Sequence, residues 1–85
     1  MHRYLVIDTN LEDRSIALRD DAGHYHVARS SGEMPMVENL LEGPPPHLGS
    51  ALLVGRGGRV MPVIFDLVDT GQVDVFERLH ASLTP

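Results

Sequence analysis

The 85-residue chain contains no cysteine. This excludes a disulfide framework, a thiolate nucleophile, an iron–sulfur cluster and a thiolate zinc site, so any metal would need histidine and carboxylate ligands. Long hydrophobic runs are also missing: the longest, at 61–65, is interrupted by Pro62 and falls far short of the roughly 18 residues that a membrane-spanning helix needs. The continuous apolar run before Asp8 is only four residues long, at 4–7, which is too short for the core of a signal peptide. We therefore expect a cytoplasmic protein without a membrane segment.

Positive charge is scarce, and lysine is absent. Seven arginines stand against twelve acidic residues, which gives a net charge of −5 at pH 7. Such a charge disfavours nonspecific attraction to nucleic acid or to an anionic membrane surface. Hydrophobic residues make up 42% of the chain and charged residues 22%, as in ordinary folded proteins. Since half of so short a chain would not hold a workable core, we predict one globular domain over residues 1–85.

Five segments have the composition and alternation of β-strands, and they lie at 4–7, 15–19, 24–29, 48–54 and 59–68. Asp20–Gly23 separates the second from the third and is typical of a hairpin turn, because aspartate and glycine tolerate turn geometry. The apolar phase of these strands predicts a common core, formed by Leu5, Ile7, Ile16, Leu18, Tyr25, Val27, Leu52, Val54, Val63 and Phe65.

Two segments have helical periodicity. Pro35 suits a first helical turn, and the apolar residues at 36, 37, 40 and 41 follow at helical spacing. Gly43 is predicted to end this middle helix in a left-handed conformation, and the three prolines after it prevent its continuation. A second helix is predicted from Asp69 or Thr70 onward, with one apolar face formed by Val75, Phe76, Leu79 and Leu83.

The predicted order of elements is β-β-β-α-β-β-α. It matches a mainly β fold, a small five-stranded OB-like barrel with a C-terminal helix. An open α+β sheet is the alternative fold.

Val6–Asn10 resembles the opening of the PIN-type metal-dependent ribonucleases, in which a strand ends in Asp-Thr-Asn. The resemblance implies that Asp8 helps to hold a divalent ion, with Glu38, Asp66 and Asp69 as candidate companions. It covers five residues, and the segment after Asn10 has the pattern of a hairpin rather than a helix. The other interpretation is that these residues end a strand and begin a turn.

His24 and His26 stand two positions apart on a predicted strand, so both side chains are expected on its outer face. This spacing permits joint coordination of zinc or nickel, with His2 or Asp8 as further ligands. Exposed polar side chains on a half-buried strand explain the same alternation.

Nucleic-acid binding is the second functional hypothesis. An OB barrel binds single strands across its second and third strands and between its loops, and these places hold five arginines: Arg14, Arg19, Arg29, Arg56 and Arg59. The glycines around Arg56 fit a hairpin turn better than a phosphate loop, because no Gly-Lys-Ser/Thr ending and no helix follow them. Acidic residues lie among these arginines, and Tyr25 is predicted to point inward.

The favoured hypothesis is a non-catalytic domain without a cofactor that binds another protein or forms a homodimer. No nucleophile stands in a pattern with its base. Met34 and Met36 are candidate interface residues, since methionine adapts to many partners, although they could instead pack as a lid over the barrel. The apolar width of the terminal helix adds Phe76 and Leu79.

Overall fold

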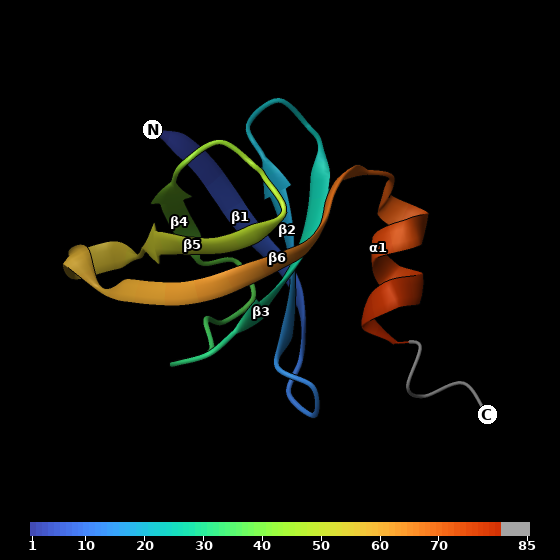
Figure 1. Cartoon of the computed structure of the whole chain (residues 1–85), viewed down its shortest axis with the longest axis horizontal. Helices are drawn as coiled ribbons and strands as arrows, with labels where there is room; N and C mark the ends of the chain where they lie inside the picture. The colour runs from blue at the N-terminus through green and yellow to red at the C-terminus, as the bar shows by residue number, and fades with distance from the viewer. Residues whose placement is uncertain (81–85) are drawn as a thin grey trace.

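The computed structural model describes residues 1–80, in which six antiparallel strands close into a barrel (Figure 1). Around the barrel they follow the order β1-β2-β3-β6-β5-β4, and β4 closes it on β1. A 3-10 turn at Arg56–Gly58 joins β5 to β6, and α1 (Gln72–Leu79) follows β6. The strands are β1 (His2–Asn10), β2 (Ser15–Asp20), β3 (Tyr25–Ser30), β4 (Leu40–Gly43), β5 (Gly49–Val54) and β6 (Val60–Thr70). Within the described residues, no helix has the length and apolar character needed to cross a membrane.

The predicted fold class is confirmed: the chain is mainly β, a closed barrel with one C-terminal helix. The barrel has six strands rather than five because the predicted middle helix is wrong, and Leu40–Gly43 forms β4 instead. The backbone before β4 bonds to β1: the Glu38 N–H donates to Val6 O, and the Val6 N–H donates to Asn39 O. Backbone groups that bond to β1 in this way are not available for the hydrogen bonds of a helix.

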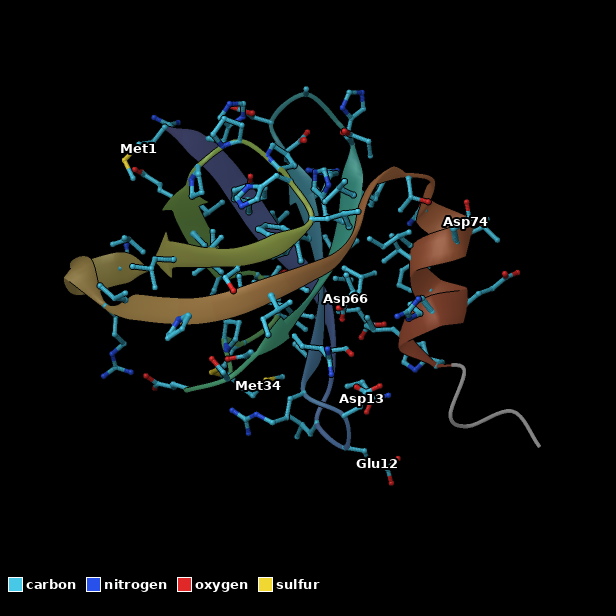
Figure 2. The ribbon with its side chains drawn as sticks, in the orientation of Figure 1. Met1, Glu12, Asp13, Met34, Asp66 and Asp74 are labelled. Carbon is cyan, nitrogen blue, oxygen red and sulfur yellow. The ribbon has the colours of Figure 1, made fainter. Side chains whose placement is uncertain are left out.

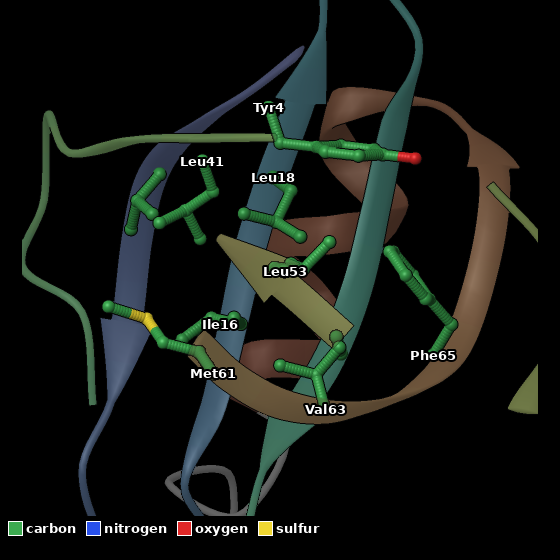
Figure 3. Packing of buried hydrophobic residues seen from close by; sticks show 10 residues of the cluster. Tyr4, Ile16, Leu18, Leu41, Leu53, Met61, Val63 and Phe65 are labelled. Atoms are coloured by element: carbon green, nitrogen blue, oxygen red, sulfur yellow. The ribbon is translucent and has the colours of Figure 1, made fainter. Parts of the chain in front are cut away.

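The barrel interior is filled by apolar side chains from all six strands (Figure 3). The inward positions predicted for β2 and β6 are confirmed, since Ile16, Leu18, Val63 and Phe65 belong to this core. The phase predicted for the other strands is wrong. The remaining core residues are Tyr4, Val6, Ala28, Leu41, Leu53 and Met61, while Leu5, Ile7, Tyr25, Val27, Leu52 and Val54 are not among them.

A second, smaller core lies on the outside of the barrel, beneath α1. Val75 and Leu79 of the helix are fully buried against Ala17 of β2 and Val27 of β3. Ile7, Tyr25 and Leu67 pack around them. These strands are therefore apolar on both faces, which explains why alternation alone assigned Ile7, Tyr25 and Val27 to the wrong side. The predicted helix position Leu83 lies outside the described residues.

Gly43 lies buried within β4, not in the predicted left-handed conformation. A Cβ atom at this position would lie 2.5 Å from Leu53 Cδ2 and 3.2 Å from the Leu52 carbonyl oxygen. We therefore expect Gly43→Ala to lower the free energy of unfolding by about 1–3 kcal/mol through overpacking, as measured by urea denaturation. Gly32→Ala is the control, because its Cβ meets only Pro62 Cδ at 3.6 Å. Equal stability of both variants and the wild type would contradict the close packing at Gly43.

Candidate functional site

A buried polar network ties the β2–β3 hairpin to the end of β6. His26 is fully buried, and its Nε2 lies 2.8 Å from Asp20 Oδ2. The Asp69 backbone N–H donates to His26 Nδ1 at 3.1 Å. Because Nδ1 must accept this bond, Nε2 carries the proton of the neutral ring and donates it to Asp20. Asp20 Oδ1 accepts the N–H groups of Ala22 and His24 in the turn.

The charges in this network follow from its hydrogen bonds. Burial raises the pKa of Asp20, but hydrogen bonds from the His26 ring and from the backbone of His24 and Ala22 outweigh it, so the pKa is lowered. Tyr4 packs edge-on against the His26 ring, with ring centroids 5.8 Å apart. Burial, followed by the negative charge of Asp20, raises the pKa of Tyr4 to about 12. At neutral pH Asp20 is therefore a carboxylate, and Tyr4 keeps its hydroxyl proton.

Asp20, His26 and Asp69 form the one group of three metal-capable side chains found within residues 1–80, with ligand atoms within 4.8 Å of one another. Both nitrogens of His26 are already engaged. Coordination through Nε2 would move the proton to Nδ1, where it would face the Asp69 N–H, so this geometry disfavours a metal at His26. The prediction that both histidines point outward is wrong for His26. His24 is exposed, and its Nδ1 lies 3.4 Å from Asp69 Oδ1.

The segment that resembles the PIN-type ribonucleases anchors α1. Asn10 Nδ2 donates to the Leu79 carbonyl oxygen at 2.6 Å, and Asp8 Oδ2 lies 2.8 Å from His80 Nε2. Asn10 also accepts the Glu12 N–H in the turn that follows. Asp8, Glu38 and Asp66 are not in the metal-capable group found within the described residues. These contacts support the second interpretation, a strand end followed by a turn, and add an attachment to the helix.

The five arginines predicted to contact nucleic acid lie on β2 and β3, in the β1–β2 turn and in the β5–β6 turn. Three arginines pair within the protein: Arg14 donates to the Ser30 and Gly32 carbonyl oxygens, Arg29 pairs with Asp66, and Arg59 pairs with Glu33. The other two, Arg19 and Arg56, are exposed at different places, on β2 and in the β5–β6 turn. The guanidinium groups of three of the five arginines are therefore already bonded to oxygen atoms of the protein.

The face on which an OB barrel would bind single strands is also occupied. Here α1 covers the outer surface of β2 and β3. Figure 2 shows Glu12 and Asp13 at the tip of the β1–β2 turn and Asp74 on α1, so acidic side chains lie on the helix and on the turn at the end of β2. This arrangement disfavours binding of a polyanion there.

The predicted interface residues have different surroundings. Met36 is exposed, whereas Met34 is partly buried and packs against the barrel core. Phe76 is partly buried on α1. Leu79 lies on the inner side of α1, fully buried against β2 and β3, and cannot contact a partner. Its assignment to an interface is therefore wrong.

An apolar surface on the outside of β5 and β6 was not predicted. It is formed by Leu52 (59% exposed), Val60 (55%), Ile64 (40%), Pro62 and Ser50, and is called the β5–β6 face below. A shallow depression of about 530 Å³ lies on this face. Its lining is uncharged and extends from the face to Pro44 on one side and Ser31 on the other. The signal was present in the sequence, since Val60, Pro62 and Ile64 alternate in one phase on β6. Val63 and Phe65 occupy the alternate positions of the same strand and belong to the predicted core, so the residues between them are expected to face outward.

Comparisons with models of protein families, with curated proteins and with solved structures find no match to this chain.

Proposed function

We propose that this chain is a non-catalytic protein-binding module that associates with itself through the β5–β6 face. The observation that carries the proposal is the exposure of Leu52, Val60 and Ile64 side by side on neighbouring strands. Contiguous exposed apolar surface of this kind is typical of interaction sites, whereas single exposed apolar residues need no explanation.

The pairing of the two strands explains why the surface is continuous. Ser50 lies opposite Ile64, Leu52 opposite Pro62, and Val54 opposite Val60, so the outward side chains alternate in step on both strands. α1 packs on β2, β3 and β6 rather than on β5. Covering the β5–β6 face with a partner would remove these side chains from water, as α1 does for Ala17 and Val27.

Charge supports a second copy as the partner. The chain carries a net charge of −5, but the five residues of the β5–β6 face carry none. Two copies related by a two-fold axis would therefore meet there without opposing like charges. A chain this short also buries a modest fraction of its surface alone, so association adds to its apolar burial.

The test is a change of charge at Leu52. We expect Leu52→Asp to shift the mass measured by light scattering from that of a dimer to that of a single chain, because a two-fold interface would bury two unpaired carboxylates. Val73→Asp is the matched control: Val73 is 69% exposed but lies on α1, and the dimer should persist. Both variants should remain folded, since both positions are on the surface. An unchanged dimer in Leu52→Asp would contradict the proposal.

A further inference from the structure

The connection between β4 and β5 (Figure 1) begins with three prolines and ends at a glycine. The ring of each proline fixes its φ angle, so the backbone at 44–46 is stiff. Gly49 has a φ of 107°, in the left-handed region that residues with a side chain rarely adopt. The turn that this glycine permits brings the ring of His47 to the backbone at the start of β5, where it lies next to Ser50.

Both ring nitrogens of His47 face backbone carbonyl oxygens. Nδ1 lies 3.0 Å from Pro45 O, and Nε2 lies 3.1 Å from Ser50 O. A carbonyl oxygen can only accept a hydrogen bond, so each nitrogen has to donate one. A neutral imidazole carries one N–H and satisfies one of the two contacts. The protonated ring carries two N–H groups and satisfies both.

The other groups that the structure places around this ring are uncharged. Phe65 of β6 packs against His47, with ring centroids 6.2 Å apart. Tyr4 of β1 donates its hydroxyl to Pro44 O at 2.6 Å, and its pKa of about 12 keeps it uncharged. None of the ion pairs found within residues 1–80 includes His47, whose side chain is exposed to water. The two carbonyl oxygens are therefore the polar contacts that distinguish the protonated ring from the neutral one.

We propose that His47 is a proton-dependent clasp between the 44–48 connection and β5. The protonated ring bridges Pro45 O and Ser50 O and holds the end of the connection against the strand. The neutral ring can keep only one of these two bonds, so the connection is held less firmly.

The clasp acts on one wall of the depression that lies on the β5–β6 face. Pro44 and Ser50 both line that depression. The bond from the Tyr4 hydroxyl holds Pro44 whether or not His47 is protonated, whereas the bond to Ser50 O belongs to the clasp. Mild acid is therefore expected to fix this wall. All the bonds lie within one chain, so the clasp does not require a second copy.

Folding favours the protonated ring, because the folded chain offers an acceptor to each of its two N–H groups. The contribution of the clasp to stability is therefore full in mild acid. It decreases as the pH rises through the range in which histidine side chains lose their charge, roughly pH 5 to pH 8.

Thermal unfolding of the wild type and of His47→Phe, at about pH 5 and about pH 8 and at one protein concentration, tests the clasp. Phenylalanine keeps an aromatic ring next to Phe65 but removes both nitrogens. We expect the melting temperature of the wild type to exceed that of His47→Phe by about 4–8 °C more in mild acid than in mild base, the effect of one hydrogen bond in a domain of this size. His2→Phe is the matched control at an exposed position of β1, and its difference from the wild type should not change with pH.

NMR of the wild type gives a second readout that needs no variant. Ring N–H protons held in hydrogen bonds exchange slowly with water, so both N–H signals of His47 should be visible in mild acid. A difference in melting temperature between the wild type and His47→Phe that stays constant with pH, or that grows in mild base, would overturn the clasp. A spectrum in mild acid that shows only one protected N–H of His47 would also overturn it. A chain that never self-associates would leave the clasp standing, so the two proposals fail separately.

Discussion

Phe65→Ala is expected to lower the free energy of unfolding by about 3–5 kcal/mol, the cost of removing a large aromatic side chain from a packed interior. Phe65 is 2% exposed, and its ring lies 5.8 Å from that of Tyr4 and 6.2 Å from that of His26, measured between centroids. The ring of His47 also lies 6.2 Å from that of Phe65, so the substitution removes contacts with three aromatic rings. Chemical denaturation monitored by circular dichroism measures the loss.

Ile64→Ala is the control for Phe65→Ala. The two residues are adjacent on β6, but Ile64 points outward and is 40% exposed, so its replacement in the single chain should change stability much less. A loss below about 1 kcal/mol for Phe65→Ala would contradict the inward phase of β6.

Asp20→Ala is expected to lower the free energy of unfolding by about 2–3 kcal/mol, because it leaves the buried His26 Nε2–H without an acceptor. The turn N–H groups of Ala22 and His24 lose their acceptor as well. Asp20→Asn should be nearly as harmful, since the amide cannot accept the His26 proton and both turn bonds with its single oxygen. Thermal and urea denaturation both report this change.

Acid provides an independent check of the same interaction. The lowered pKa of Asp20 means that its carboxylate is preferred in the folded state, so its contribution is full at neutral pH. It is lost as the pH falls below the ordinary aspartate value of about 4, and the wild type should then approach Asp20→Asn in stability. Asp21→Ala, at the exposed neighbouring position, should remain close to wild type throughout. A stability gap between wild type and Asp20→Asn that did not narrow in acid would contradict this account.

The fold class could be predicted because the residues that form the turns between strands are distinctive in the sequence. Asp20–Gly23 marked the β2–β3 hairpin, and Gly57 and Gly58, at φ of 79° and 80°, marked the turn before β6. β4 was missed because Leu40 and Leu41 also fit helical spacing. Their strand conformation depends on pairing with Tyr4 and Leu5, far away in the chain.

The buried network could not be predicted from alternation, and alternation indicated the β5–β6 face only on β6. His26 looked like an outward polar residue, but the β2–β3 hairpin brings it to Asp20, and the pairing of β3 with β6 brings it to the Asp69 backbone. Val27, its apolar neighbour, points outward because it packs against α1 on that side of the barrel. Leu52 and Leu53 are consecutive and apolar, so only the register with β6 decides which one faces water.

The measurement that tests self-association most directly is sedimentation equilibrium of the wild-type chain over a wide range of micromolar concentrations. We predict a mass that rises from that of one chain to that of two and then stops, as a closed two-fold dimer requires. A mass that stays at one chain throughout would contradict the account, and a mass that rises beyond two chains would contradict its closed symmetry.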